Sequence, residues 1–307
     1  ICSARELGLG DDHDGIIVLT ELGCAADDLA PGQDAIPLLG LDESTIEINV
    51  TPDRGYSFAI RGVAREYAHA TGAAFRDPAG IDVAGTAGDG FPVEIDDRAP
   101  VRGRVGCDRF VARAIRGFDP AAPSPAWMRA RLEAAGMRSI SLAVDVTNYV
   151  MLELGQPLHA YDLALVTAPI VVRRAHPGES IVTLDDATRV LDGEDLLITD
   201  SLGGHGARAI GIAGVMGGAT TEVSGSTTDI LLEAAHFDPI TIARTARRHR
   251  LGSEASRRFE RAVDPALPSV AVQRAVDLLV ERGGGVAEDV WTDVNRVAPP
   301  TPIEMDW

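Results

Sequence analysis

The sequence predicts a multidomain protein of the α+β class, in which a large mixed α/β domain follows smaller ones. Its 307 residues suffice for about two domains with hydrophobic cores. Segments typical of strands and of helices both occur, but they do not alternate regularly and no G-x-G-x-x-G motif follows a strand, so a dinucleotide-binding fold is not favoured. We expect part of a β domain over 1–40, a small α+β domain and linker over 41–91, the large domain over 92–296, and the start of a further domain over 297–307.

Turn signals and two apolar patterns mark the first 91 residues. A Gly/Asp-rich turn at 8–15 precedes an apolar segment at 16–19 that predicts a strand. The turn lacks the spacing and distal Glu of a calcium loop, so a solvated turn is favoured over a metal site. Residues 44–50 alternate polar and apolar, and an Arg/Glu/Ala-rich helix is expected to end by Gly72. The Gly-rich stretch 80–92 predicts a linker.

Two helices are expected early in the large domain. One opens at Ser124-Pro125 and stops at Gly136, with Pro at the start and Gly at the end. The other is short, is capped by Asp145 or Thr147, and ends at Gly155. Its apolar positions are expected to face inward: Val150, Met151 and Leu154.

Strands and two further helices follow. Strands are expected at 170–173 and 196–199, and a third apolar run ends on Glu233, where a strand end would aim the carboxylate into a cleft or into water. Asp238-Pro239 is expected to start a helix that Gly252 closes, and Ser253 to cap the next.

Polar side chains gather in the segment 144–162, which indicates a pocket. His159 lies just beyond a Gly-Gln-Pro turn, where an imidazole on an ordered loop can position water or a phosphate; the alternative is a satisfied structural histidine. The glycines of 211–218 can bring backbone amides against a ligand, or simply form a tight turn. That run lacks the Lys-Ser/Thr of a P-loop, so phosphate binding there is not favoured.

Composition narrows the class of protein. Hydrophobic residues make up 45% and aromatic residues 5%, and no apolar run approaches the roughly 18 residues of a membrane span. No signal peptide is visible, so we expect a cytoplasmic protein with no membrane association. The three cysteines are far apart and form no CxxC, which predicts reduced thiols and neither disulfides nor zinc: Cys2, Cys24 and Cys107. The absence of an initiator Met leads us to expect a piece of a longer polypeptide.

Charge is distributed unevenly around a net of −18. The first 100 residues hold 6 arginines and 19 acidic residues, whereas 244–307 holds 10 of each. Two basic islands stand out, at 98–116 with six arginines and at 244–261 with seven. Such patches could hold a polyanion locally, or they could be salt-bridged helix faces.

Four segments, in this order, resemble the beta subunit of bacterial phenylalanine–tRNA ligase: VDVTNYVMLELGQPLHAYD, GIAGVMGG, LLEAAHFDP and ARTARRHRLGSEASRRFERAVDPAL. TPDRGYSFAIRGVAREYA extends the resemblance toward the N-terminus. It implies that 1–40 ends an OB-fold tRNA-binding domain, that 41–91 is a small linking domain, and that 92–296 is the editing domain.

The resemblance also implies partners and cofactors. The whole enzyme is a cytoplasmic heterotetramer of two alpha and two beta subunits, and its synthetic site, which uses ATP and Mg, is on the alpha subunit. This fragment would hold no cofactor or metal. Its partners would be the phenylalanine tRNA and the alpha subunit.

The family's editing domain hydrolyses tyrosine wrongly esterified to the phenylalanine tRNA, and its site carries over motif by motif. His159 would position the attacking water or the tRNA 3′ end, and Glu233 would accept a hydrogen bond from the tyrosine phenol. Thr147 and Asn148 would hold the amino-acid backbone. The resemblance further implies that Gly217 and Gly218 form the pocket floor, and that Ser253, where the family often has Thr, lines the wall with Ala255.

The implied reaction is chemically coherent. A site built to hydrogen-bond a hydroxyl rejects the analogue that lacks it. An ester is already activated, so hydrolysis needs no strong nucleophile, which agrees with the lack of an evident Ser-His-Asp or metal constellation. The alternatives are a non-catalytic tRNA-binding or subunit-assembly module and an unrelated small-molecule binding domain.

Overall fold

The computed structural model describes residues 2–9, 13–20, 24–39, 42, 44–299 and 302–305. The chain divides into two compact units, Ile1–Ile48 and Asn49–Trp307. The mixed α+β class is confirmed. The domain boundaries and the OB-fold assignment stay predictions.

The described part of the first unit contains two short helices, a 3₁₀ turn at Ala26–Asp28 and α1 at Ala35–Leu38. Asp34 caps α1 by accepting a hydrogen bond from the Ile36 amide. The strand predicted at 16–19 is wrong, because these residues pair with no strand among the described residues and Ile16 is 56% exposed. Residues 10–12 of the predicted Gly/Asp turn lie outside the described residues.

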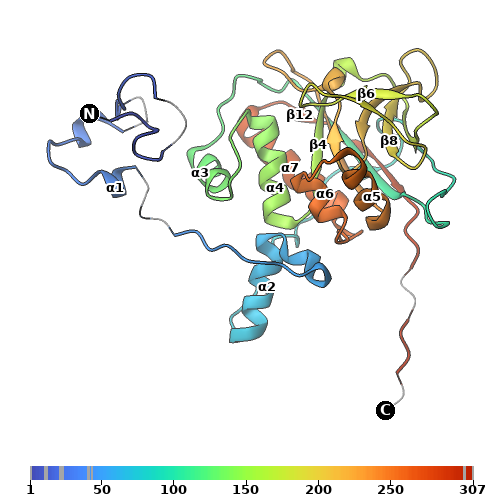
Figure 1. The fold of residues 1–307 in the computed structure, drawn as a ribbon, viewed down its shortest axis with the longest axis horizontal. Coiled ribbons are helices and arrows are strands. Elements are labelled where there is room, and N and C mark those ends of the chain that lie inside the picture. Colours follow the sequence, from blue (N-terminus) through green and yellow to red (C-terminus); the bar gives the residue numbers. More distant parts are fainter. Residues whose placement is uncertain are drawn as a thin grey trace. The chain divides into compact units, whose positions relative to one another are not determined.

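The second unit is built on two larger sheets and a hairpin (Figure 1). The six-stranded sheet has the order β1-β13-β3-β11-β4, with β12 also paired to β3. Its strands are β1 (Thr86–Ala87), β3 (Cys107–Arg116), β4 (Leu158–Asp162), β11 (Ile230–Phe237), β12 (Val286–Ala287) and β13 (Val290–Asn295). Apart from the parallel β1–β13 pair, its pairings are antiparallel.

The five-stranded sheet has the order β10-β9-β8-β5-β2, and a separate hairpin pairs β6 with β7. These strands are β2 (Val93–Asp96), β5 (Ile170–Arg174), β6 (Ser180–Val182), β7 (Thr188–Val190), β8 (Leu196–Asp200), β9 (Arg208–Ile212) and β10 (Met216–Gly217). The hairpin joins this sheet's edge, since the Leu184 amide donates to the Gly217 carbonyl.

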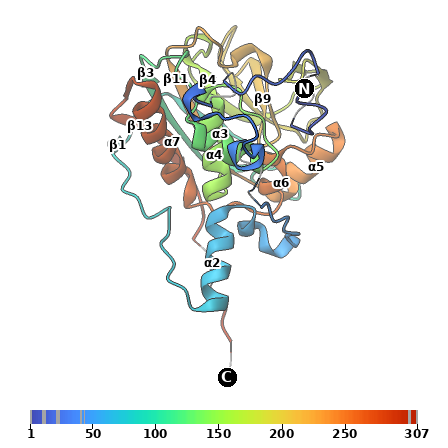
Figure 2. The same cartoon turned by 90° about the vertical axis from the view of Figure 1, so that its left-hand side faces the viewer.

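Helices cover the six-stranded sheet on one side (Figure 2). The helices of the unit are α2 (Ile60–Thr71), α3 (Ala126–Ala134), α4 (Leu142–Leu154), α5 (Pro239–His249), α6 (Glu254–Phe259) and α7 (Leu267–Gly283). Short 3₁₀ turns occur at Pro52–Ser57, Leu163–Leu165 and Ala219–Thr221. Helices α3, α4 and α7 share one core with the sheet. The five-stranded sheet shares the other core with α5 and α6.

The alternation of strand residues sorts side chains between these two cores. In β11, Leu232 and Ala234 pack toward the helices, whereas Leu231 and Ala235 pack toward the second sheet. Because successive side chains of a strand point to opposite faces, Glu233 points with Leu231 toward the second sheet.

Most helix predictions are confirmed, with corrected ends. Helix α2 ends at Gly72 in the left-handed conformation, and α3 ends just before Gly136. Helix α5 ends at His249, with Arg250 as its C-cap, rather than at Gly252, since Leu251 turns into the core. The Asp238 and Ser253 caps are confirmed.

The capping prediction for α4 is wrong, because the helix begins at Leu142. Leu142 and Ala143 are buried, so packing extends the helix beyond its polar signals. Asp145 is fully buried inside the first turn and accepts hydrogen bonds from Ser124 and Ser139 and from the Ile140 amide. The end at Gly155 is confirmed.

Two further corrections concern loops and strand ends. The linker predicted at 80–92 contains β1, and its Gly90 lies so close to Trp291 that a Cβ there would be 2.8 Å from the Trp291 Cα. Glycine at position 90 therefore permits close backbone approach. Glu233 does not end its strand but lies in the middle of β11.

Candidate functional site

Strand pairing brings the two central predicted residues together. In the antiparallel β4–β11 pair, Glu233 lies directly opposite His159. Tyr161, two residues after His159, faces the same side of the sheet and belongs to the same core as Leu231. The three polar side chains therefore share the space between the two sheets.

That space holds a cavity of about 90 Å³. His159, Tyr161 and Glu233 line it from the six-stranded sheet, and Gly217 and Ala255 line it from β10 and α6. The other lining residues are Pro157, Leu158, Ile198, Gly211, Ile212, Ala213, Gly214, Val215, Met216, Phe237 and Phe259. The cavity is thus mostly apolar with a few convergent polar groups, which is typical of small-molecule sites.

Hydrogen bonds inside the site leave specific atoms free. The Tyr161 hydroxyl donates to Glu233 Oε2. The Tyr161 and His159 rings meet edge to face, with centroids 4.4 Å apart. His159 Nε2 is buried and has no hydrogen-bond partner in the described chain. A buried polar atom without a partner in a cavity wall indicates a place for a ligand or water.

Burial shifts the pKa values of Glu233 and His159 in opposite directions. It raises the pKa of Glu233 to about 7, while the hydrogen bond from Tyr161 opposes the rise. It also lowers the pKa of His159 to about 4. In both groups desolvation disfavours the charged form. At neutral pH the imidazole is therefore uncharged and the carboxyl is near its midpoint.

Gln156, a residue that sequence reasoning did not assign, ties β4 to β11. It is fully buried, and its side-chain nitrogen donates to the carbonyls of Pro157 and Ala235. Its Oε1 is a second buried atom without a partner among the described residues.

The Gly-rich turn packs against the histidine. A Cβ at Gly217 would lie 2.6 Å from His159 Cε1 and 3.0 Å from Leu184 Cδ1. Gly218 is not among the lining residues, and a Cβ there would lie 2.8 Å from the Ile210 carbonyl oxygen. Glycine at these positions permits close packing, which agrees with the close-approach interpretation of the turn.

Ser253 and Ala255 occupy the start of α6. The Ser253 hydroxyl donates to the Val215 carbonyl over 2.7 Å and accepts from the Ser256 amide over 3.1 Å. It therefore joins the helix end to the Gly-rich turn, while Ala255 contributes to the cavity wall. Ser253 itself does not line the cavity.

Thr147 and Asn148 lie on α4 and are not among the residues that line the cavity. The Thr147 hydroxyl donates to the Val144 carbonyl within the helix. The structure does not bring them together with Glu233, and their role in holding the amino-acid backbone stays a prediction.

Tyr161 is the polar member of the site that sequence reasoning missed. The signal was present: in the strand that starts at Leu158, positions 159 and 161 must share a face. The loop interpretation of His159 hides this relation, because a loop has no two-residue periodicity of side chains.

Acidic side chains neutralise most of the arginines in the two basic islands. In the first island Arg104, Arg109 and Arg116 pair with acidic side chains, and Arg113 donates to Gln273. In the second, Arg257 and Arg258 pair with Glu254, and Arg261 pairs with Glu260. Within the described residues, the salt-bridged interpretation holds for these arginines except Arg113, whose partner Gln273 is neutral.

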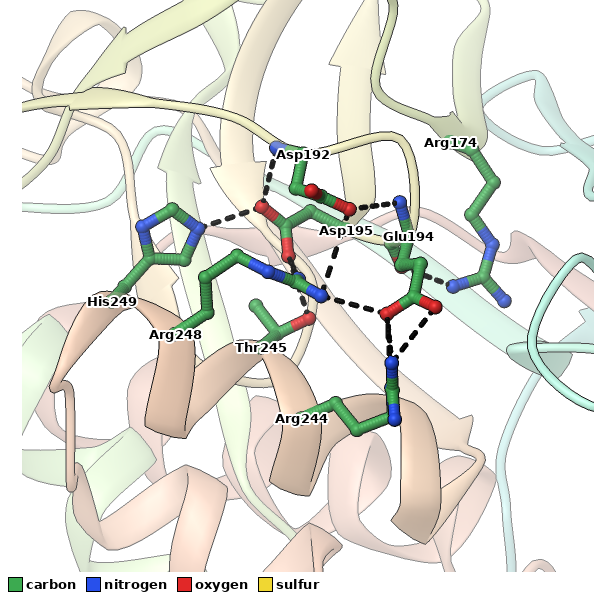
Figure 3. Close-up of polar contacts among 8 residues, drawn as sticks. All are labelled: Arg174, Asp192, Glu194, Asp195, Arg244, Thr245, Arg248 and His249. Carbon is green, nitrogen blue, oxygen red and sulfur yellow. Dashed lines mark hydrogen bonds and ion pairs between the residues drawn. The ribbon is translucent and has the colours of Figure 1, made fainter.

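An acidic loop neutralises two arginines of α5, Arg244 and Arg248 (Figure 3). Arg244 and Arg248 both bond to Glu194, and the fully buried Asp195 binds Arg248, Thr245 and His249. Arg247 and Arg250 are exposed and form no side-chain pair in the described chain. They lie at the end of α5, just before the segment that supplies Ala255 to the cavity.

Metal binding finds no support in the donor set. Among the described residues no three His, Cys, Asp or Glu side chains lie together as a metal site. Cys2, Cys24 and Cys107 are all free thiols. Within the same residues, no helix combines the length and apolar character that a membrane span needs.

Comparisons with known proteins agree with one another. A family profile described as "B3/4 domain" matches residues 106–284. The phenylalanine--tRNA ligase beta subunit of Leifsonia xyli subsp. xyli is 58% identical over 306 residues, which cover 99% of this chain and 35% of that protein. Those of Bifidobacterium longum and Thermobifida fusca are 56% and 55% identical, covering 96% and 99% of this chain and 35% and 34% of theirs.

The chain therefore spans about a third of the length of the curated relatives it matches. A crystal structure of an N-terminal fragment of the phenylalanyl-tRNA synthetase beta-subunit from Pyrococcus horikoshii is similar with a TM-score of 0.41 and 14% identity, over 81% of this chain and 66% of that one.

The opposite pKa shifts predict opposite effects of pH on stability. Between pH 4.5 and 7 the folded state holds the Glu233 proton more tightly than the unfolded state, so the contribution of Glu233 to the free energy of unfolding falls as pH rises. For His159 the unfolded state holds the proton more tightly between pH 4 and 6.5, so its contribution rises with pH. In a variant that lacks one of the two groups, the dependence of the free energy of unfolding on pH should therefore show the contribution of the other group.

Glu233→Gln should make the free energy of unfolding rise more steeply with pH than in the wild type. Between pH 4.5 and 7 the accumulated difference should be about 3 kcal/mol at most. His159→Gln should make it fall more steeply. Urea unfolding at a series of pH values from 4 to 8 measures both, with the exposed Glu222→Gln as control. Parallel curves for all four proteins would contradict the assigned burial effects.

Gly217→Ala should displace the His159 ring, because the added Cβ would come within 2.6 Å of it. The matched control is Gly225→Ala, whose Cβ would meet nothing within 4 Å. Imidazole proton and nitrogen NMR signals of His159 report the displacement. Unchanged signals in Gly217→Ala would show that the turn is looser than its packing indicates.

Proposed function

Because this chain belongs to the B3/4 domain family, we propose that it carries the editing site of a phenylalanine–tRNA ligase beta subunit, which hydrolyses tyrosine wrongly esterified to the phenylalanine tRNA. The observation that carries the proposal is the pairing of Glu233 with His159 on adjacent strands at one small cavity. The curated relatives support it, since each is named a phenylalanine--tRNA ligase beta subunit.

The buried carboxyl suits the recognition of a phenol. An ionised Glu233 accepts a hydrogen bond from a hydroxyl, and charge-assisted bonds of this kind are stronger than neutral ones. A phenylalanine ester lacks the hydroxyl and would leave Oε1 of the desolvated carboxylate without a partner, since Tyr161 bonds only to Oε2. Since the pKa of Glu233 is about 7, the ionised form that reads the phenol is populated from neutral pH upward.

His159 would act at the ester end of the substrate. Its pKa of about 4 keeps the imidazole neutral at pH 7. In the tautomer with the proton on Nδ1, the unpartnered Nε2 can accept a hydrogen bond from the attacking water or from a ribose hydroxyl of the tRNA 3′ end. Because an ester is an activated acyl group, a held water suffices without a nucleophilic side chain.

The cavity is small for the ring of the substrate. Its volume is about 90 Å³, and an engineered apolar cavity of about 150 Å³ binds benzene. Met216 lines the cavity and has a flexible side chain that can change rotamer at low cost. We propose that such movement of the lining admits the tyrosine ring.

The rest of the enzyme would supply the synthetic reaction. We propose that the longer protein works in the cytoplasm with an alpha subunit and the phenylalanine tRNA, as a heterotetramer of two alpha and two beta subunits that uses ATP and Mg. The Gly-rich turn of this chain has no P-loop lysine, and its described residues offer no metal-ligand cluster. In the proposed hydrolysis, side chains of this chain act on the ester together with a water molecule.

Glu233→Ala should lower hydrolysis of the tyrosine ester of phenylalanine tRNA by about 10- to 100-fold, because it removes a charge-assisted hydrogen bond worth roughly 1.5–3 kcal/mol. Hydrolysis of the phenylalanine ester should not fall and can rise, since the variant lacks a buried carboxylate whose Oε1 this ester leaves without a partner. His159→Ala should depress hydrolysis of both esters. Loss of each ester from tRNA charged with labelled amino acid measures these rates.

Equal losses on the two esters in Glu233→Ala would contradict the division between a reading residue and a residue at the scissile bond. If the wild-type chain binds the tRNA but hydrolyses neither ester, the non-catalytic tRNA-binding or assembly module becomes the better account.

The unpaired arginines predict where tRNA phosphates bind. Replacing Arg247 and Arg250 by Ala should weaken tRNA binding and reduce the slope of log affinity against log salt by roughly 0.7 to 0.9 for each phosphate that is no longer bound. Filter binding at several salt concentrations measures the slope.

The matched control is the double replacement of Arg129 and Arg138 by Ala, which removes two other exposed charges that have no acidic partner among the described residues, from the part of the unit around α3. If both double variants change the slope equally, the end of α5 is not a specific contact and only net charge matters.

A further inference from the structure

Tyr161 contacts both of the residues to which the proposed function assigns roles. Its hydroxyl bonds to Glu233 Oε2, and its ring meets the His159 ring at an interplanar angle of 71°. It is 1% exposed and ranks among the largest fully buried side chains.

The bond to Tyr161 makes the two oxygens of the Glu233 carboxyl unequal. Oε2 holds the tyrosine hydroxyl, whereas Oε1 has no hydrogen-bond partner among the described residues. The carboxyl group lines the cavity. A carboxylate held at one oxygen loses rotational freedom, so its second oxygen presents a lone pair in a fixed direction.

We propose that Tyr161 is a positioning residue that sets the specificity of the site: by holding Oε2 it fixes the carboxyl of Glu233 so that Oε1 receives the hydroxyl of a tyrosyl substrate. This inference rests on the proposed function and deepens it. It adds a second phenol, supplied by the protein, to the recognition of the substrate's phenol.

The packing of Tyr161 argues against the opposite role, in which its hydroxyl merely fills the place of the substrate and is displaced. Its ring belongs to the core that joins the two sheets, and Tyr161 lies opposite Leu231 of β11 in the strand register. Swinging the ring out would open a cavity in that core and expose an aromatic surface, which is costly. Tyr161 therefore stays in place when a ligand enters.

Tyr161 also affects the charge of the reading carboxyl. Its hydrogen bond favours the ionised form of Glu233 and holds the pKa below the value that burial alone would produce. Removal of the hydroxyl should therefore raise the Glu233 pKa above 7. A residue with a purely structural role would not move this titration.

The experiment replaces Tyr161 by Phe in the full chain, which keeps the ring and its contact with His159. Tyr149→Phe is the matched control, because its hydroxyl donates to Glu153 over 3.1 Å and Tyr149 lies outside the cavity lining. Two readouts are taken: the titration of Glu233 by carbon NMR of its labelled carboxyl, and hydrolysis of the tyrosine and phenylalanine esters of tRNA as a function of pH.

In Tyr161→Phe we expect the Glu233 titration and the acid limb of tyrosine-ester hydrolysis to move together to higher pH. Above that limb, tyrosine-ester hydrolysis should fall about 2- to 10-fold, the effect of removing one hydrogen bond. Phenylalanine-ester hydrolysis should change little, and Tyr149→Phe should match the wild type.

Two outcomes would overturn the inference: an unchanged Glu233 titration in Tyr161→Phe, or faster tyrosine-ester hydrolysis, which would identify Tyr161 as a competitor of the substrate. A wild-type chain that hydrolyses neither ester, alone or within the whole enzyme, would overturn the proposed function instead, and the substrate part of this inference with it. The Glu233 titration distinguishes the two failures, because it tests the effect of Tyr161 on Glu233 whether or not the chain hydrolyses an ester.

Discussion

The burial of β11 on both of its faces is the constraint on which the site depends. Helices α4 and α7 cover one face of its sheet and the five-stranded sheet covers the other. Along such a strand the alternation of side chains decides which residues meet the helices and which meet the second sheet. Glu233 falls on the inter-sheet side and in register with His159, so a carboxyl and an imidazole are held together where water is scarce. Gln156 reinforces this register by bonding across to Ala235.

Burial without an opposing charge then determines the chemistry. The described structure has many ion pairs in which an arginine lowers the pKa of its acidic partner, as Arg61 does for Asp77. Glu233 has no such partner; its bond comes from the neutral Tyr161 hydroxyl, and desolvation dominates. The carboxyl and the imidazole both shift toward their neutral forms, so Glu233 can exchange a proton near neutral pH while His159 stays uncharged there. This contrast separates the proposed functional groups from the structural ones.

The arginines illustrate how tertiary contacts redistribute charge. By sequence, 244–261 is a basic patch, but five of its seven arginines pair with acidic side chains. Arg244 and Arg248 pair with the acidic loop around Glu194 and Asp195, and the other three pair with Glu254 and Glu260. The buried Asp195 bonds to three side chains of α5 and so fixes that loop against the helix. Only exposed arginines without an acidic partner remain for a polyanion, and Arg247 and Arg250 are the members of this island in that condition among the described residues.

The sequence by itself determined the mixed class, the ends of α2 and α3, and the caps at Asp238 and Ser253. These features depend on local chemistry: glycine in left-handed turns, side-chain oxygens at helix starts, and hydrophobic periodicity. Through four motifs the sequence also indicated the candidate site residues. Tertiary structure alone decided the rest. The start of α4 follows the burial of Leu142, and β1 forms only because β13 offers it a partner. Tyr161 joined the site because strand register and sheet packing, which act between residues far apart in the chain, placed its hydroxyl on Glu233. Local periodicity can place Tyr161 on the same face as His159, but no local pattern contains its pairing with Glu233, since strand pairing and burial are properties of the whole fold.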